Sequence, residues 1–149
     1  MSDPQIDWLS DEFQAVFWSA KRALKEAADL AYRSHGVRNG QQFILMCLWD
    51  VDGLTPGEIA RRLGLATPTV TRAATRMEAA GLVVRKSDPT DARLVRIYLT
   101  EGGMKLKRVL DTEMRALSER ALGSLSEKEK SQFVRFLREL RTNVARPQR

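Results

Sequence analysis

The residues of this chain that are best equipped for recognition chemistry fall on one predicted helix, from Pro68 to Ala80. Its apolar residues recur at positions that face inward, and its outward positions carry arginine and threonine. A guanidinium can donate two hydrogen bonds to one planar acceptor edge, and a threonine hydroxyl can both donate and accept. These groups bind without making or breaking covalent bonds, so the pattern indicates recognition. The outward residues and those at the start of the helix are Thr67, Pro68, Thr69, Thr71, Arg72, Thr75 and Arg76.

Side chains that carry catalysis or hold transition metals are scarce in this sequence. The chain has one histidine, His35, and one cysteine, Cys47. A protein-only transition-metal site usually needs three or four histidine or cysteine ligands, and a serine or cysteine nucleophile would have to use His35 as its base. No motif supports a catalytic carboxylate pair. We therefore predict that the protein is not an enzyme, holds no metal or cofactor and has no intrachain disulfide.

The helix with the outward arginines is the second of two helices joined by a tight turn. Thr55-Pro56-Gly57-Glu58 predicts a helix start, with a threonine cap, a proline in the first position and a glutamate three residues after the cap. This helix ends before the turn Gly64-Leu65-Ala66. Thr67-Pro68 is interpreted as a second threonine cap with proline first, and Gly81 ends the helix. Two helices joined by a three-residue turn with glycine predict a helix-turn-helix.

A β-hairpin is predicted directly after this pair of helices. Residues 82–86 and 94–99 are the expected strands, and in the second strand apolar residues at 95, 97 and 99 alternate with Arg96 and Tyr98. The charged, turn-rich segment 87–93 joins the two strands. A hairpin in this position, after a recognition helix, is typical of a wing.

Longer amphipathic helices are predicted on either side of the central region. Residues 9–31 place their apolar side chains on one helical stripe, and residues 41–51 form a helix that is apolar nearly all round. Thr100 is expected to cap a helix that runs through Ala121. The capping box of Ser126 with Glu129 opens a last helix, through Val144.

These elements predict a mainly α fold with a small β-hairpin wing, in one domain covering residues 1–149. Residues 40–100 form the winged helix-turn-helix, and residues 1–35 and 101–149 form dimerisation helices. The apolar stripes of these flanking helices exceed what the small central region can cover, so we expect an intertwined homodimer. The alternative is that they wrap their own domain.

Charge is distributed unevenly along the chain. The net charge is +6, and residues 55–99 hold eight lysines and arginines against four acidic residues. The positive excess therefore lies around the helix-turn-helix and the wing, where it would attract a polyanion. The longest apolar run, Phe43 to Trp49, is far shorter than the ~18 residues that span a bilayer, and the N-terminus lacks the features of a signal peptide. We expect a cytoplasmic protein that does not contact a membrane.

Five short motifs follow one another in a fixed order from Leu54 to Gly103. They are Ile59-Ala60-x-x-Leu63-Gly64-Leu65, Thr69-Val70-Thr71-Arg72, Glu78-x-x-Gly81-Leu82-Val83-x-Arg85, Asp91-x-Arg93 and Leu99-Thr100-x-x-Gly103. Together they resemble the MarR family of bacterial regulators. The resemblance implies a homodimer whose winged domains bind a pseudo-palindromic operator in double-stranded DNA, commonly as a repressor released by a small phenolic or carboxylate effector. Departures from the family pattern are Ala73, Ala74 and Leu94.

A helix-turn-helix places the N-terminal part of its second helix in the major groove. Arg72 is the expected base reader, through the O6 and N7 of guanine, and Arg76, one turn later, is an expected phosphate contact. Thr67 and Thr69 can offer hydroxyls and backbone N–H groups to a phosphate. The alternative is that the outward arginines form only a solvated helix face and bind no ligand.

The wing is expected to contribute one contact residue and several structural ones. The resemblance implies that Arg93 enters the minor groove, where a narrow A/T-rich groove deepens the negative potential. Asp88 and Asp91 would be repelled by phosphates, so we interpret them as structural. Asp88 helps to fix the turn, and Asp91 can bond turn amides or hold a nearby arginine such as Arg85.

An effector pocket is predicted near the first two helices. Its candidate residues are Trp18, His35, Phe43, Cys47 and Trp49. The alternative is that the aromatic residues belong to the core and that Cys47 is an inert small hydrophobe. Three other functions stay open: a redox-responsive regulator that uses Cys47, a basic winged-helix module that binds protein, and a metal sensor, which the single cysteine and histidine disfavour.

Overall fold

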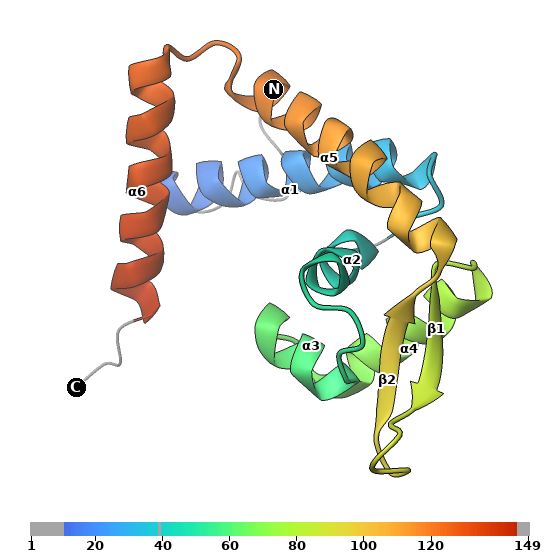
Figure 1. Ribbon diagram of the computed structural model, residues 1–149. Helices are drawn as coiled ribbons and strands as arrows, with labels where there is room; N and C mark the ends of the chain where they lie inside the picture. The colour runs from blue at the N-terminus through green and yellow to red at the C-terminus, as the bar shows by residue number, and fades with distance from the viewer. Residues whose placement is uncertain (1–10, 39, 146–149) are drawn as a thin grey trace. The chain divides into compact units, whose positions relative to one another are not determined.

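The computed structural model of the chain describes residues 11–38 and 40–145 (Figure 1). The described residues form six helices and one antiparallel hairpin, which confirms the predicted mainly α fold with a β wing. Two compact units adjoin in the sequence between Met114 and Arg115, so α5 contributes to both. The elements are α1 (Glu12–Arg33), α2 (Gln41–Asp50), α3 (Pro56–Leu63), α4 (Thr67–Ala79), β1 (Val83–Ser87), β2 (Val95–Leu99), α5 (Glu101–Leu122) and α6 (Glu127–Ala145).

Helix α3 begins and ends where the sequence predicts. The Thr55 hydroxyl accepts the N–H of Glu58 at 3.2 Å, and the Glu58 carboxylate accepts the N–H of Thr55 at 2.9 Å. This capping box satisfies two donors that a helix start would otherwise leave without partners. Gly64 ends the helix at φ +66°, a left-handed conformation that glycine adopts without strain.

The predicted threonine cap of α4 is wrong. Thr67 is the first residue inside the helix, and the N-cap is Ala66, which has no side chain able to cap. The Thr69 N–H instead donates to the Ala66 carbonyl at 3.0 Å. Because Pro68 has no N–H, the first turn has one donor fewer to satisfy, and the helix starts without a side-chain cap.

The two strands of the wing pair from Val83 opposite Leu99 to Ser87 opposite Val95. A third segment extends this sheet. The Gly53 N–H donates to the Ile97 carbonyl at 3.0 Å, and the Ile97 N–H donates to the Leu54 carbonyl at 2.8 Å. The turn after α2 is therefore hydrogen-bonded to β2. Gly53 has φ +75°, and a Cβ there would lie 2.7 Å from the Tyr98 ring, so this approach needs glycine.

Both strands begin one residue later than predicted. The Leu82 N–H donates to the Met77 carbonyl at 2.9 Å and so completes the end of α4. The Leu94 N–H donates to the Asp91 carbonyl at 3.0 Å and so belongs to the loop. Val95, which the alternation places on the buried side, is 41% exposed because it lies beyond the core toward the tip of the hairpin.

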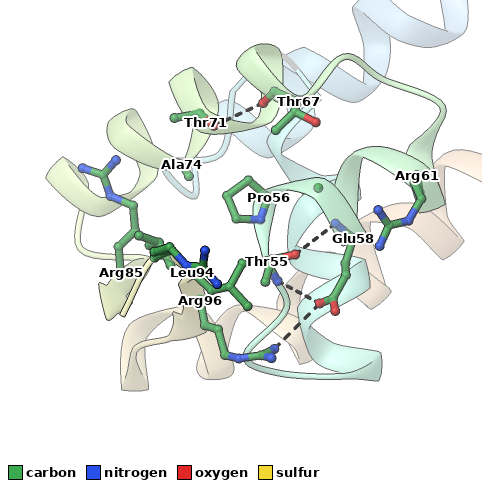
Figure 2. A pocket seen from close by; sticks show the side chains of 13 residues that line it. Thr55, Pro56, Glu58, Arg61, Thr67, Thr71, Ala74, Arg85, Leu94 and Arg96 are labelled. Atoms are coloured by element: carbon green, nitrogen blue, oxygen red, sulfur yellow. Dashed lines mark hydrogen bonds and ion pairs between the residues drawn. The ribbon is translucent and has the colours of Figure 1, made fainter. Parts of the chain in front are cut away.

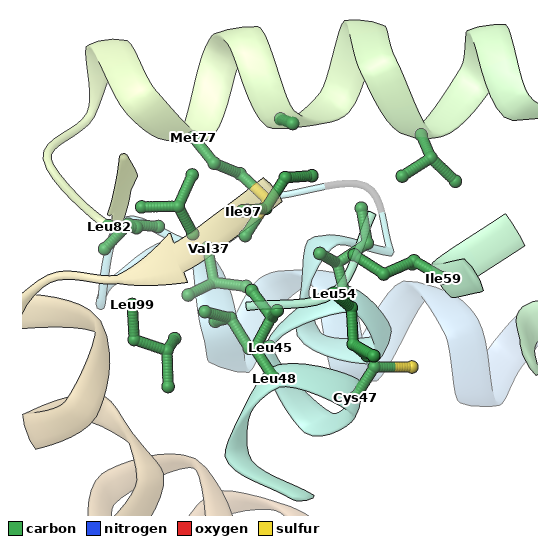
Figure 3. Packing of buried hydrophobic residues seen from close by; sticks show 14 of the residues in the cluster. Val37, Leu45, Cys47, Leu48, Leu54, Ile59, Met77, Leu82, Ile97 and Leu99 are labelled. Carbon is green, nitrogen blue, oxygen red and sulfur yellow. The ribbon is translucent and has the colours of Figure 1, made fainter. Parts of the chain in front are cut away.

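One hydrophobic core holds the helix-turn-helix and the base of the wing together (Figure 3). Every element from α1 to α5 contributes to it, including Tyr32 at the end of α1 and Leu110 of α5. Its largest fully buried side chains are Leu45, Leu48, Ile59, Met77, Ile97, Leu110, Val37, Val70 and Val83. The predicted central burial of residues 41–51 is correct for most of α2, while Phe43 and Met46 are exposed at 50% and 42%.

Helix α1 keeps much of its apolar stripe in contact with solvent. Its N-cap is Asp11, whose carboxylate accepts the Gln14 N–H at 3.1 Å. The predicted start at Leu9 lies outside the described residues. The exposed apolar side chains of α1 are Phe13, Val16, Trp18, Leu24 and Leu30.

The starts of the last two helices follow the predicted capping motifs. The Thr100 hydroxyl accepts the Gly103 N–H at 3.1 Å, and Ser126 forms a reciprocal capping box with Glu129. Helix α6 has no buried residue, although it carries an apolar face. Its exposed apolar side chains are Phe133, Val134, Phe136, Leu137 and Val144.

Candidate nucleic-acid interface

Helix α4 has one buried face and one exposed face. Val70, Ala74 and Met77 are fully buried against the core. All seven residues singled out at its start and on its outer side are exposed, as the helical spacing predicts: Thr67, Pro68, Thr69, Thr71, Arg72, Thr75 and Arg76. Within the described part of the chain, neither Arg72 nor Arg76 forms an ion pair. Their guanidinium groups are therefore available to an external acceptor.

The threonines on α4 are less free than the sequence suggests. The Thr71 hydroxyl donates to the Thr67 carbonyl at 3.2 Å, and the Thr75 hydroxyl donates to the Thr71 carbonyl at 3.0 Å. This bonding to the preceding turn is common for threonine inside helices. The hydroxyl protons are thus engaged. The Thr71 oxygen remains available as an acceptor, whereas the Thr75 oxygen already accepts the Arg85 Nη1 at 3.1 Å.

Arg85 links the first strand of the wing to α4, and its partner differs from the predicted one. Its guanidinium donates to the Glu78 carboxylate at 3.0 and 3.2 Å, and the Arg85 N–H donates to the same carboxylate at 2.8 Å. A further bond reaches the Thr75 hydroxyl at 3.1 Å. These bonds from Arg85 lower the pKa of Glu78. The sequence suggests Asp91 as a partner of Arg85, but the Asp91 carboxylate bonds to a different arginine.

That arginine is Arg93 in the wing loop. The Asp91 carboxylate accepts the Arg93 backbone N–H at 3.0 Å and the Arg93 Nε at 3.2 Å. The predicted bond from Asp91 to a turn amide is therefore present. The Arg93 side chain is 91% exposed, so its terminal nitrogens face solvent at the edge of the hairpin. Asp91 sets the direction of Arg93 without burying it.

Asp88 is the buried centre of the wing loop, which agrees with its predicted role in fixing the turn. Its carboxylate accepts the Thr90 N–H at 2.8 Å, the Thr90 hydroxyl at 2.7 Å and the Asp91 N–H at 3.0 Å. It also binds the guanidinium of Arg96. The bond from Arg96, followed by those from Thr90, holds the pKa of Asp88 far below its ordinary range.

A cleft of about 610 Å³ separates α3 from the wing, with the start of α4 along its rim (Figure 2). Four arginines line it, and Glu58 is the acidic residue among the lining side chains. The arginines are Arg61, Arg85, Arg93 and Arg96. Three of the four already pair with carboxylates: Arg85 with Glu78, Arg93 with Asp91 and Arg96 with Asp88. Among the described residues, Arg61 is therefore the cleft arginine that forms no ion pair.

The predicted effector residues do not gather in one place. Phe43 and Cys47 line a shallow depression of about 440 Å³ together with Met46, Asp50, Arg62 and Leu63. Burial raises the pKa of the Cys47 thiol, which works against a reactive thiolate.

The other three predicted pocket residues have separate structural contacts. The Trp49 indole donates to the Gly103 carbonyl at 3.0 Å and packs against the core. This agrees with the alternative that the aromatic residues belong to the core. Trp18 is 45% exposed on α1 and donates to Gln14. His35 Nε2 lies 3.2 Å from Glu113 Oε1 of α5.

Two residues that shape this surface are not identified by the sequence pattern. The pattern places Arg96 only as one member of an alternating strand, and Glu78 only as part of a motif. A signal for Glu78 was present, because a carboxylate shortly before a tight turn can reach an arginine just after it. No local signal marks the contact of Arg96 with Asp88 or with the turn at Gly53.

Two absences concern the described residues only. No helix among residues 11–38 and 40–145 is long and apolar enough to cross a membrane. In the same part of the chain, no group of three or more histidine, cysteine or acidic side chains is arranged to hold a metal ion.

Comparison with known proteins identifies the family. The MarR family model matches residues 38–95. The regulator TtmR of Methylorubrum extorquens is 40% identical over 109 residues, which are 73% of this chain and 55% of TtmR, so the chain spans about half the length of that relative. The uncharacterised regulator YsmB of Bacillus subtilis is 30% identical over 106 residues, covering 70% of this chain and 73% of YsmB. The structure of the S. aureus MepR–DNA complex superposes with a TM-score of 0.80 at 26% identity, covering 90% of this chain and 99% of the other. The chain belongs to the MarR family of winged helix-turn-helix transcriptional regulators.

Proposed function

We propose that the protein regulates transcription by binding a specific double-stranded DNA sequence through α4 and the wing. The observation that carries this proposal is the outer face of α4, where Arg72 and Arg76 are exposed and free of ion pairs within the described residues, while the opposite face is buried. The second helix of a helix-turn-helix enters the major groove with such a face. The S. aureus MepR structure, a DNA complex of the same fold, supports the assignment.

Each exposed residue has a proposed role. Arg72 reads a guanine through two hydrogen bonds, and Arg76 binds a phosphate. The start of α4, from Thr67 to Thr69, approaches a phosphate of the same strand, and Thr71 accepts a hydrogen bond from a base amino group. Thr75, whose hydroxyl is engaged by Thr71 and Arg85, offers its methyl group to a base. Arg93 enters the minor groove at the flank of each half-site. Arg61, which lines the cleft between α3 and the wing and forms no ion pair within the described residues, draws the DNA backbone toward this face.

The flanking helices form the proposed dimer. Residues 40–100 are the DNA-binding region, and residues 1–35 and 101–149 supply the dimerisation helices. The exposed apolar faces of α1 and α6 support this proposal, because apolar surface of this extent is normally covered by a partner. A two-fold dimer would bind a pseudo-palindrome with half-sites ~34–36 Å apart. Light scattering should give about twice the chain mass of 16.9 kDa.

We also propose that the protein is a repressor released by a small aromatic carboxylate or phenol. The depression lined by Phe43, Cys47 and Leu63 offers an apolar surface. The guanidinium of Arg62, which also lines it, donates to Asp50 at 2.9 Å, so a carboxylate ligand would have to share or replace that contact. A ligand concentration of 100 times the dissociation constant would stabilise the free protein against unfolding by about 2.7 kcal/mol. A thermal-shift screen with benzoate and phenol tests this part. If neither ligand raises the melting temperature or weakens DNA binding, release by this class of ligand is refuted.

The test of DNA binding is a selection from random duplexes with the purified full chain. We expect an inverted repeat with half-sites about ten base pairs apart, centre to centre. The Arg72→Ala variant should lose the selected half-site, and Arg38→Ala, which removes an exposed arginine outside the proposed DNA-binding region and the dimerisation helices, should select the wild-type sequence. If the wild-type protein enriches no sequence, the proposal fails and a protein-binding role for the basic face gains support.

A further inference from the structure

Arg96 connects three parts of the molecule that are far apart in the sequence. It lies in β2, and its Nη1 donates to the Gly53 carbonyl, in the turn after α2, at 2.9 Å. Its Nε donates to the Asp88 carboxylate in the wing loop. The same Nη1 lies 3.8 Å from the carboxylate of Glu58 in the first turn of α3, the contact drawn in Figure 2. We call these contacts the Arg96 clamp.

Each partner in the Arg96 clamp is itself held in place. The Asp88 side chain is only 7% exposed and accepts three further hydrogen bonds from Thr90 and Asp91. Glu58 closes the capping box of α3 with Thr55. A continuous series of contacts therefore runs from the body of the helix-turn-helix through Arg96 and Asp88 to Asp91, which holds Arg93.

The tip of the wing has little apolar packing to fix its direction. Leu94 and Val95 are each 41% exposed, and the Arg93 side chain is 91% exposed. A two-stranded hairpin without a packed face is marginally ordered in water. A planar guanidinium can hold a carboxylate and a carbonyl at fixed angles with little further loss of entropy. The polar contacts of Arg96 therefore tie the loop to α3 and to the turn after α2.

We propose that Arg96 is a positioning residue that sets the direction in which the wing presents Arg93, and thereby determines recognition of the base pairs flanking each half-site. This inference rests on the proposed binding of DNA by α4 and the wing. Arg96 acts through Asp88 and Asp91 and does not contact the flank itself. Loss of the clamp leaves the outer face of α4 in place. A variant without the clamp should therefore lose recognition of the flank and keep recognition of the half-site.

The test uses the full chain, the duplex that the wild-type protein selects and two altered duplexes. One altered duplex has a changed half-site, and the other has G/C pairs in place of A/T pairs at the flanks. The variants are Arg96→Ala and Arg96→Lys. Lysine keeps the charge, but a single ammonium cannot reproduce the two directed bonds of the guanidinium. The matched control is Lys86→Ala. Lys86 lies opposite Arg96 in the strand register and carries the same charge, but its ammonium lies over the Tyr98 ring.

We expect the wild-type protein to prefer the A/T flank roughly tenfold, in the range of a single unfavourable base pair. In both Arg96 variants this ratio should fall to about one, with half-site discrimination unchanged. Lys86→Ala should bind all three duplexes more weakly by one common factor. Hydrogen exchange of the free protein should be faster in the segment 88–95 of the Arg96 variants than in the wild type or the control.

Retention of the flank preference in both Arg96 variants would overturn the proposal, whether or not the loop exchanges faster. Equal loss of half-site and flank discrimination in a folded Arg96→Lys variant would also overturn it, since Arg96 would then support the whole fold. Melting temperatures identify any variant that fails to fold. If Arg96→Ala fails to fold, Arg96→Lys provides the test. A wild-type protein that selects no sequence refutes DNA recognition itself, which is a different result.

Discussion

Replacement of Arg72 and of Arg93 by alanine should separate the two modes of DNA recognition. Both side chains are exposed, but their surroundings differ. Arg72 forms no ion pair within the described residues, whereas Arg93 donates its Nε to Asp91 at 3.2 Å. Neither substitution opens a cavity in the core, so each should change the free energy of unfolding by at most about 0.5 kcal/mol. Their effects should appear in DNA binding.

The size of each effect follows from the contact that is lost. A bidentate arginine–guanine pair is worth about 1–3 kcal/mol, so loss of both copies of Arg72 from a dimer costs about 2–6 kcal/mol on the selected duplex. The dissociation constant then rises by a factor between about 30 and about 2 × 10⁴. Discrimination at one position of each half-site should relax. Arg93→Ala should weaken binding to many sequences, most at A/T-rich flanks, and should reduce the slope of log K against log salt by about 0.9 per copy.

Fluorescence anisotropy at several salt concentrations measures both quantities on the same duplexes. Arg38→Ala is the matched control, because it removes one exposed arginine that lies outside α4, the wing and the proposed dimerisation helices. The assignment is refuted if Arg72→Ala keeps full sequence discrimination while Arg93→Ala abolishes it. It is also refuted if the control reduces binding as much as either variant.

Three further predictions concern stability. Gly103→Ala places a Cβ 2.2 Å from the Leu82 carbonyl oxygen and should lower the free energy of unfolding by about 1–3 kcal/mol, whereas Gly57→Ala, 3.8 Å from its nearest neighbour, should be neutral or stabilising in urea titrations. Leu110→Ala removes a fully buried side chain and should cost about 2–5 kcal/mol in the same assay; a cost below 0.5 kcal/mol, on the order of a surface change, would contradict the packing described. Asp88 has a folded pKa below its ordinary value of 3.8, so its contribution to stability is complete above that pH and is lost as the pH falls below it. Melting curves should therefore show a smaller acid-induced loss for Asp88→Asn than for the wild type, from a lower starting stability at neutral pH.

Local signals in the sequence predict the helix starts well, since a capping box needs only neighbouring residues. The boxes at Thr55 and Ser126 form as expected. The cap at Thr67 fails because proline occupies the second helical position there and Ala66 takes the cap. The exposed face of α4 was also predictable, because helical spacing alone determines which residues share a side.

Contacts between distant segments were not predictable in the same way. Periodicity says that Arg96 faces away from Ile97, but not that Asp88 and Gly53 lie within its reach. The effector residues show the same limit. Aromatic residues on α1 and α2 indicate apolar surface, yet only the packing decides that Trp49 bonds to Gly103 while Phe43 stays exposed.

The attachment of the turn after α2 to β2 has a consequence for the order of folding. Leu99 donates its N–H to Asp52, and Arg96 bonds to Gly53, so these bonds close loops of more than forty residues. Closing such loops costs chain entropy that the contacts of the hairpin alone do not offset. The turn between α3 and α4 involves only neighbouring residues and closes at a lower entropic cost. The wing should therefore gain protection late, after α2, α3 and α4 have assembled. Pulse-labelling of refolding chains should mark the amides of Ile97 and Leu99 after those of Ile59 and Val70.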